Sequence, residues 1–420
     1  MITRITNREF IVSRSEFQSI EELPSILERK ADGDILRWYI SKAGAKEIVV
    51  DATLFKKAGI DLPEGVHDIV YPGKSVVLSL IPTGVGCDIG GYAADAAPVT
   101  ALLSSCVDYL ITNPNAVNAS NFINMADNVL YSEGFTIDLF CKGLVNLYKP
   151  YGNKVGLIVE KTDRESLETV FNIINTARAV HGVDIEHVVV TEEAIGGRCV
   201  QYKSGAYVGT LDDPSVLFDA TDRLIAKGVT AVAVTSNIRD LPADNYARHF
   251  DGLHPNPVGG AEAVLSHLIS EKYRIPAAHA PLMNIKELDL KSNIVDARGA
   301  GEFSSRSGLA CILIGLGKAP QIKKDNNCRI KDIVNIDNVL AMVTPAGTLG
   351  GIPMLYAQKY NIPIIAVKEN KTVLDVTGEK LGLKNVIEAD NYLEAVGVLQ
   401  ALRSGISIES LRRPLKTLRF

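Results

Sequence analysis

Residues 254–282 read HPNPVGGAEAVLSHLISEKYRIPAAHAPL, and they contain one complete structural unit of the predicted fold. A polar loop leads to the glycine pair Gly259-Gly260, which opens a helix with one apolar face. A short apolar strand follows and ends at His279. A loop, a helix and a strand in this order indicate one repeat of an α/β fold with a parallel sheet.

The start of this helix has the features of an anion seat. The glycine pair leaves the backbone unhindered there, and the first amide N–H groups of a helix have no partner within the helix. The positive end of the helix dipole lies behind them, which favours a carboxylate or a phosphate. We therefore expect the backbone amides of Gly259 to Ala261 to bind an anionic group.

The same plan occurs at two other places in the chain. Gly90-Gly91 and Gly350-Gly351 each precede a helix and then a strand, which ends near Asn113 or Asn370. Loops of this kind emerge at the carboxyl edge of a parallel sheet, where ligands bind. We expect the three turns to line one crevice. The alternative is that glycine pairs only let helices pack closely on strands.

The remaining sequence alternates between apolar strands and amphipathic helices. We expect helices at 23–30, 34–43, 162–181, 214–227, 352–360 and 391–404. We expect strands at 47–50, 76–81, 107–112, 155–159, 188–190, 230–235, 309–316, 339–343 and 362–367, and a hairpin at 198–202 and 206–209. The predicted fold is α/β, with mostly parallel sheets in two or more Rossmann-like lobes and a ligand cleft between them.

The length of 420 residues favours more than one domain. We expect an N-terminal α/β lobe over 1–150 with the glycine loop 84–91. A central lobe over 151–330 would hold the HPNPVGG motif, and a C-terminal unit over 331–420 would hold TPAGTLGG.

Composition excludes several classes of protein. The net charge of −5 gives no basic excess for nucleic acid, and 46% hydrophobic residues are typical of a globular protein. No apolar run reaches the ~18 residues of a membrane span. The first ten residues hold no hydrophobic signal core, and the six cysteines never form a CxxC pair. We expect a cytoplasmic protein that does not act at a membrane.

The loop after the strand at 76–81 does not match a dinucleotide fingerprint. Gly84, Gly86 and Gly90 are spaced with one residue too many, and the next strand ends at Asn113 where an acidic residue should stand. The cofactor, if any, stays unknown. Cys87 lies in this loop before a helix, where the helix dipole can lower the pKa of a thiol.

Histidines supply the candidate proton-exchanging groups. We expect His254 and His279, on a loop and at a strand end, to exchange protons at neutral pH. Glu262, Asp296 or Glu369 would orient them or act as the partner base. His267, in mid-helix, fits a core or a functional position equally well. No HExxH or HxH spacing occurs, so no metal ligands are assigned.

The candidate substrate-binding residues share places in glycine turns, at strand ends or in the polar segment 289–308. They are Thr83, Gly84, Gly86, Gly90, Gly91, Asn113, Asn115, Asn256, Gly259, Gly260, Arg298, Ser304, Thr344, Gly347, Gly350, Gly351 and Asn370.

Four motifs together carry a resemblance to a known family. They are PTGVGCDIGGYAADAAP with NPNAVNAS after it, HPNPVGGAEAVLSHLI, IPAAHAPL and IPIIAVKENKTVLDVT. The chain resembles, from about residue 40 to residue 390, an uncharacterised bacterial family classed only as a domain of unknown function, number 3326. The resemblance implies that most of the chain is one functional unit, and it carries no activity, substrate or cofactor with it.

The sequence favours an enzyme that uses acid–base chemistry on a small carboxylate- or phosphate-bearing metabolite, with isomerase or lyase chemistry preferred. Two alternatives stay open: a metal-assisted hydrolase, and a non-catalytic protein that binds a small molecule or nucleotide. We expect a homo-oligomer, with the homodimer as the default.

Overall fold

The structure is a computed structural model. It describes residues 2–57, 73–113, 125–239, 243–282, 294–305, 308–324 and 332–419. The predicted site residue Asn115 lies outside these ranges.

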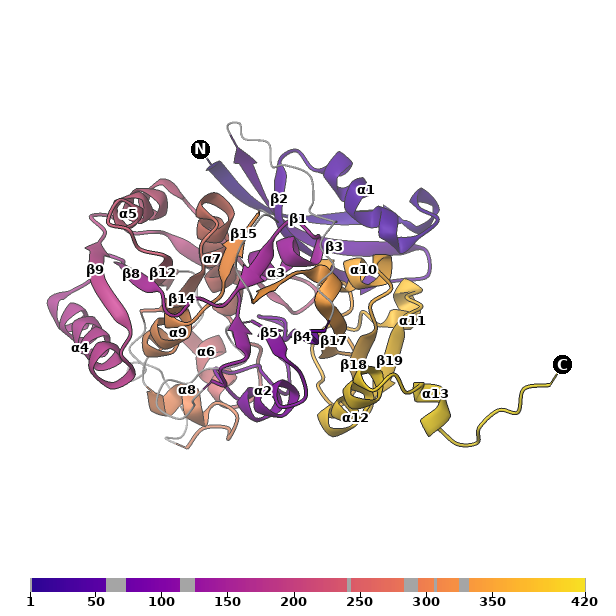
Figure 1. The fold of residues 1–420 in the computed structure, drawn as a ribbon. Helices are drawn as coiled ribbons and strands as arrows, with labels where there is room; N and C mark the ends of the chain where they lie inside the picture. Colours follow the sequence, from indigo (N-terminus) through magenta and orange to yellow (C-terminus); the bar gives the residue numbers. More distant parts are fainter. Residues whose placement is uncertain are drawn as a thin grey trace.

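The N-terminal segment forms an antiparallel sheet in the order β1-β3-β2. Its strands are β1 (Ile2–Ser13), β2 (Asp34–Ala43) and β3 (Glu47–Lys57). Helix α1 (Leu23–Lys30), expected from the sequence, and the short turns η1 (Arg14–Glu16) and η2 (Ile20–Glu22) join β1 to β2. Figure 1 shows this sheet at the top of the molecule.

The predicted helix at 34–43 is wrong, because this segment is strand β2. Leu36, Trp38 and Ile40 are buried, and the residues between them are more exposed. This alternation has the two-residue period of a strand with one buried face. The aromatic residues Trp38 and Tyr39 also favour a strand.

A six-stranded parallel sheet forms the centre of the molecule, in the order β19-β18-β17-β4-β5-β6. Its strands are β4 (Val76–Ser79), β5 (Tyr109–Thr112), β6 (Val129–Tyr131), β17 (Val339–Pro345), β18 (Ile364–Val367) and β19 (Val386–Ala389). The sheet therefore joins strands from the predicted N-terminal lobe with strands from the predicted C-terminal unit. The boundaries at 150 and 330 stay a prediction.

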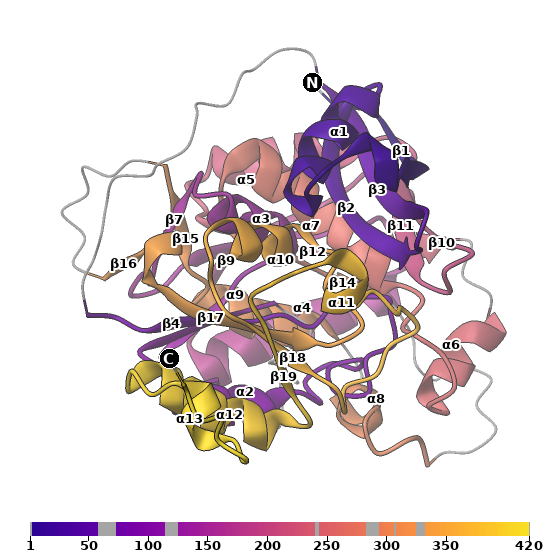
Figure 2. The ribbon, with the colours of Figure 1, turned by 90° about the vertical axis from the view of Figure 1, so that its right-hand side faces the viewer.

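Helices cover both faces of this sheet (Figures 1 and 2). On one face, α2 (Ala97–Ser104) and α12 (Tyr392–Arg403) pack against each other and against β5, β17 and β18. On the other, α3 (Gly134–Cys141) packs against α10 (Ile352–Lys359). The short helices α11 (Gly378–Leu381) and α13 (Ile408–Leu411) complete the C-terminal region.

A second parallel sheet lies beside the first, in the order β14-β12-β8-β9. Its strands are β8 (Lys154–Val159), β9 (Asp184–Val190), β12 (Ala231–Ser236) and β14 (Ala277–Pro281). Its helices are α4 (Arg164–His181), α5 (Ser215–Ile225), α7 (Gly259–Tyr273) and α9 (Gly308–Gly317). Helices α4 and α9 pack on one another, and α7 packs against β12 and β14.

The predicted strand at 309–316 is wrong, because the segment is helix α9. A short continuous apolar run does not distinguish a buried strand from a buried helix by periodicity. Here the run packs against the second sheet and against α4. Gly315 lets α9 approach Tyr131, since a Cβ at this position would lie 2.7 Å from the tyrosine Cζ.

Two smaller sheets and two short helices complete the described structure. One sheet holds β10 (Gly197–Gln201), β11 (Tyr207–Leu211) and β13 (Ile238–Arg239), and the other holds β7 (Asn146–Tyr148), β15 (Gln321–Lys323) and β16 (Ile333–Val334). The helices are α6 (Ala243–Phe250) and α8 (Ala300–Ser305), and a further short turn is η5 (Ile336–Asn338). Strands β10 and β11 form the predicted hairpin. The predicted α/β class with mostly parallel sheets is confirmed.

Candidate functional site

The order in which successive strands are added reverses in the middle of the six-stranded parallel sheet, between β4 and β17. From β4 the chain continues to β5 and β6 on one side, and from β17 it continues to β18 and β19 on the other. Connections that leave two neighbouring strands in opposite directions open a crevice at the carboxyl ends of those strands. The fold therefore places a crevice beyond β4 and β17.

A cavity of about 210 Å³ lies at this place. The residues after β4 and β17, strand β2, helices α3 and α7, and strand β14 form its wall. Most lining side chains are apolar, and the polar ones come from several elements. A largely apolar cavity with a few convergent polar groups is the usual form of a small-molecule site.

His279 and Glu262, both predicted from the sequence, meet in this cavity. His279 is the middle residue of β14, and its Nδ1 lies 3.5 Å from Oε1 of Glu262 on α7. The His279 side chain is fully buried, whereas 15% of the Glu262 side chain is exposed. On the far side of the ring, Nε2 lies 2.8 Å from Oγ of Ser236, at the end of β12. Glu262 is therefore the more exposed of the two residues of this pair that line the cavity.

A second histidine–carboxylate pair lines the same cavity. Nδ1 of His267, on α7, lies 2.7 Å from Oε2 of Glu133, and both side chains are buried. Glu133 also accepts hydrogen bonds from the amides of Phe135 and Thr136 at the start of α3. Burial alone would raise the pKa of Glu133, but His267 and these donors outweigh it, and the pKa is lowered. Gly134 leaves space beside the imidazole, since a Cβ there would lie 3.2 Å from Nε2.

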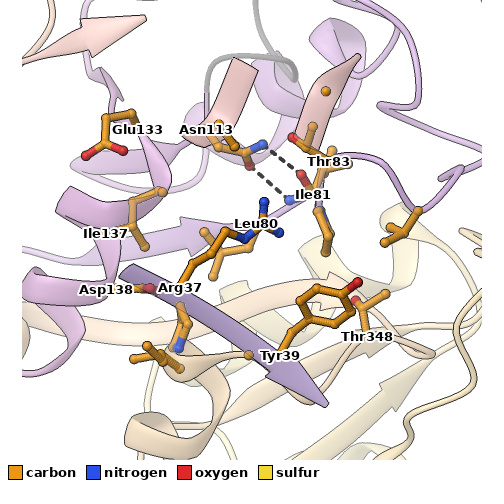
Figure 3. Close-up of a pocket in the computed structure, with 18 of the residues that line it drawn as sticks. Arg37, Tyr39, Leu80, Ile81, Thr83, Asn113, Glu133, Ile137, Asp138 and Thr348 are labelled. Atoms are coloured by element: carbon orange, nitrogen blue, oxygen red, sulfur yellow. Dashed lines mark hydrogen bonds between the residues drawn. The ribbon is translucent and has the colours of Figure 1, made fainter. Parts of the chain in front are cut away.

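Arg37 and Asp138 are the other charged side chains of the cavity. Among the residues that the structure describes, neither forms a hydrogen bond or an ion pair. The Arg37 guanidinium lies 5.7 Å from the ring centre of Tyr39, and Figure 3 shows it extending from β2 toward Leu80 and Asn113. Burial raises the pKa of Asp138 to about 7, against the opposing effects of Lys142 and Arg37.

Two asparagines hold the glycine loop that follows β4. Oδ1 of Asn113 accepts the amide of Ile81, and Nδ2 donates to the carbonyl of the same residue (Figure 3). Asn370 does the same with Ile89 and also donates to the hydroxyl of Tyr392. The amide groups of both asparagines are therefore used in hydrogen bonds to the backbone of this loop. Asn113 and Asn370, which follow two different strands in the sequence pattern, thus both hold the loop after β4 in place.

Several of the predicted glycines allow close approach between segments. A Cβ at Gly259 would lie 2.2 Å from Cγ2 of Thr83, and one at Gly260 would lie 2.6 Å from Cα of Val208. A Cβ at Gly350 would lie 2.5 Å from Cβ of Ile40, whose amide donates to the Gly350 carbonyl. Close packing therefore accounts for these positions without a ligand.

Eight of the predicted site residues line the cavity. They are Thr83, Asn113, Gly259, Glu262, His279, Thr344, Gly350 and Gly351. The other described candidates do not line it: His254, Asp296, Glu369, Gly84, Gly86, Gly90, Gly91, Asn256, Gly260, Arg298, Ser304, Gly347 and Asn370. Of the three glycine turns, those at Gly259 and at Gly350-Gly351 thus line the cavity, whereas Gly90-Gly91 does not, and its loop reaches the cavity through Thr83 and Val85.

Some of these other candidates have structural partners. Arg298 pairs with Asp296 through two hydrogen bonds, and its guanidinium lies over the Tyr92 ring. Glu369 is exposed and accepts the amide of Tyr392. The carbonyl of His254 lies 3.0 Å from Nδ1 of His249. These residues stabilise loops outside the cavity wall.

Cys87 departs from the expectation for its thiol. It is buried, and burial raises its pKa, with a further contribution from Asp95 and Asp88. The expected lowering by a helix dipole is wrong, because desolvation disfavours the thiolate more strongly.

The sequence reasoning missed four polar residues of the site: Arg37, Glu133, Asp138 and Ser236. Arg37 was hidden by the wrong assignment of β2 as a helix. Ser236 had a visible pattern, since it directly follows the strand expected at 230–235. Glu133 precedes a helix whose apolar sequence, GFTIDLFC, also carries Asp138. A carboxylate in such an apolar segment was the pattern that could have revealed Asp138.

Two general features of the described residues bear on the class of protein. None of the helices in these ranges combines the length and apolarity needed for a membrane span. In the same ranges, no three His, Cys, Asp or Glu side chains gather closely enough to hold a metal ion.

Comparison with known proteins gives a family and no activity. The chain is 34% identical over 342 residues to an "uncharacterized lipoprotein" of Synechococcus sp., an overlap that covers 81% of this chain and 94% of the relative. No solved structure matches. A family model described as "Protein of unknown function (DUF3326)" matches residues 75–412. The chain therefore belongs to the DUF3326 family of proteins of unknown function.

Proposed function

We propose that the protein is an enzyme that performs acid–base chemistry on a small anionic metabolite bound in the cavity beyond β4 and β17. One observation carries the proposal. The cavity holds the Arg37 guanidinium, which has no carboxylate partner among the described residues, together with Glu262, which is backed by the buried His279.

The cavity is suited to an anion for two reasons. A guanidinium presents several N–H donors in a plane that matches a carboxylate. The first residues of α7 and α10 also line the wall, and neither helix has a side-chain cap at its N-terminus. Helix N-termini carry partial positive charge. An anionic group held by Arg37 would be stabilised by both.

Glu262 is the proposed general base. It would take a proton from a carbon next to the bound carboxylate, and the electron pair would move toward the carboxylate at Arg37. His267 would deliver a proton to the opposite face of the same carbon, which inverts that centre and completes an isomerisation. His279 is a positioning residue, because its ring lies behind Glu262 and is fixed on its other side by Ser236.

Deuterium incorporation tests this function even though the substrate is unidentified. The protein is incubated in D₂O with a mixture of small carboxylate and phosphate metabolites, and mass spectrometry identifies any compound that gains deuterium. We expect at least one such compound with the wild type. Glu262→Gln should exchange it ~100- to 10,000-fold more slowly, the usual effect of losing a positioned acid–base group.

The matched control is Glu168→Gln, a neutralised carboxylate on the exposed face of α4, which should exchange at the wild-type rate. Equal exchange by Glu262→Gln and the wild type would refute the role of Glu262. Ligand capture with no exchange of any compound would favour the non-catalytic binding protein. Activity that needs an added metal and is lost with a chelator would favour the hydrolase.

Cytoplasmic location and homo-oligomeric assembly are also proposals. The Synechococcus relative is named a lipoprotein, so membrane attachment is the competing hypothesis for location. Fractionation of cells that express the native gene tests location, and light scattering of the purified protein tests assembly.

A further inference from the structure

We propose that the ligand of the cavity is a zwitterionic amino acid with an apolar side chain, whose carboxylate binds Arg37 and whose ammonium group binds Asp138. This inference rests on the proposed function and narrows its substrate class. The evidence for it comes from Arg37 and Asp138, the two charged side chains of the cavity wall that belong to neither histidine–carboxylate pair.

Arg37 and Asp138 carry opposite charges yet stay apart. They lie on different elements, β2 and α3, and do not form an ion pair with each other. A partly buried charge without a partner is unfavourable, since its lost hydration is not replaced. A ligand with an anionic and a cationic end on neighbouring atoms would satisfy both side chains. A free amino acid has this arrangement.

The protonation of Asp138 is consistent with a cationic partner. With the cavity free of ligand, burial raises the pKa of this carboxyl to about 7, so part of the population is protonated at neutral pH. An ammonium group beside it would favour the carboxylate form and lower the pKa. Binding should then release a fraction of a proton at pH 7.

The charges of the wall oppose a ligand with two negative charges. Among the residues that the structure describes, Glu133, Asp138 and Glu262 line the cavity, and Arg37 is the single lysine or arginine that does so. A phosphate dianion or a dicarboxylate would place its second negative charge beside these carboxylates without a cation to pair with it. A single carboxylate is matched by Arg37.

The remaining wall is suited to an apolar side chain. Leu80, Ile137, Ile352 and Met354 line the cavity together with Trp38. The four non-aromatic side chains have no N–H or O–H group to donate, so a polar substituent beside them would lose its hydration without replacement.

Trp38 makes the test direct, because it is the only tryptophan of the chain and it lines the cavity. Its fluorescence is titrated with alanine, leucine, methionine and phenylalanine. Each amino acid is compared with its analogue without the amine and its analogue without the carboxylate, which for leucine are 4-methylpentanoate and 3-methylbutylamine. Inorganic phosphate is titrated as well.

We expect at least one amino acid to bind tenfold or more tightly than both of its analogues. Asp138→Asn should remove the advantage over the analogue without the amine and leave binding of that analogue unchanged. Arg37→Gln should weaken binding of the amino acid and of the carboxylate analogue, but not of the amine. Calorimetry at pH 7 in two buffers should show proton release with the wild type and none with Asp138→Asn. Asp184→Asn, on the exposed edge of β9, is the control.

The failing outcomes separate this inference from the proposed function. The inference of a zwitterionic ligand is wrong if the carboxylate analogues bind as tightly as the amino acids and depend on Arg37 to the same degree. That result would leave the proposed anion site intact. Tighter binding of phosphate overturns the inference in the same way. Absence of any binding that depends on Arg37 overturns both.

Discussion

Nδ1 of His279 lies 3.5 Å from Oε1 of Glu262, while Nε2 of the same ring lies 2.8 Å from Oγ of Ser236. Serine, histidine and carboxylate in this order resemble the groups of a nucleophilic triad. Ser236 is fully buried, however, and does not line the cavity. The geometry instead favours a carboxylate that faces the ligand and is held from behind by the other two groups.

This interpretation predicts that substitutions of Ser236, His279 and Glu262 slow deuterium exchange to different degrees. Ser236→Ala should slow deuterium exchange by less than about tenfold, whereas Glu262→Gln should slow it by ~100-fold or more. His279→Gln should fall between them, because the ring no longer holds the Glu262 carboxylate from behind. If Ser236→Ala abolished activity as completely as Glu262→Gln, the hydroxyl would be a nucleophile and the acid–base scheme would be wrong.

The His267–Glu133 pair predicts a stability that depends on pH. The pKa of Glu133 is lowered in the folded protein, so its ionised form stabilises the fold at every pH above the ordinary value of about 4.5. This stabilisation is lost as the pH falls through the lowered pKa of the folded state. Glu133→Gln should therefore unfold more easily than the wild type at pH 7, by about 2–4 kcal/mol, and the difference should shrink toward pH 3.

Thermal unfolding measured from pH 7 to pH 3 checks this dependence. Glu186→Gln, at an exposed position of β9, should differ little from the wild type at any pH. A difference between wild type and Glu133→Gln that stays constant over this range would show that the ionisation of Glu133 does not contribute.

The glycine of the central motif predicts a packing defect. A Cβ at Gly260 would lie 2.6 Å from backbone atoms of Tyr207 and Val208, which cannot rotate away. Gly260→Ala should therefore destabilise the protein by about 1–3 kcal/mol or more. Gly397→Ala is the matched control, since Gly397 lies in α12 with no atom within 4 Å of the added methyl. Because alanine is the better helix former, this change should stabilise by up to about 1 kcal/mol. Equal effects in chemical denaturation would contradict the packing account.

Local patterns predicted most of the fold. The 254–282 stretch predicted α7 and β14, and the segments around 155–235 predicted the other three strands of the second sheet and the separate β10–β11 hairpin, because each follows a clear period or ends at a known capping residue. The errors at β2 and α9 have one origin. In both segments the tertiary surroundings decide: β2 pairs with β3, and α9 is buried against the second sheet.

Fewer residues of the candidate site than of the fold could be predicted from the sequence. His279 and Glu262 could be proposed because both lie in one motif, and 17 residues separate them in the numbering (279 − 262). Arg37 and Asp138 lie far from that motif and reach the cavity only through the packing of β2 and α3. Asn370 was proposed to bind substrate, but its amide is used by the backbone of Ile89. Polar residues at strand ends can serve a ligand or a loop, and spacing alone does not separate the two.

Asn370 gives the last prediction. Its buried amide accepts the Ile89 N–H and donates to the Ile89 carbonyl and to the Tyr392 hydroxyl, so it ties the loop after β4 to the strand end of β18. Asn370→Ala leaves these groups without a partner, and each such buried group costs about 1–3 kcal/mol. We expect a loss of at least ~2 kcal/mol, or ~2 °C or more in Tm, and faster proteolysis within residues 84–91. Asn172→Ala, at an exposed position on α4, should change stability by less than about 0.5 kcal/mol. If the two variants unfolded alike and the loop resisted protease equally, Asn370 would be available for a ligand, and its place in the substrate-binding set would be restored.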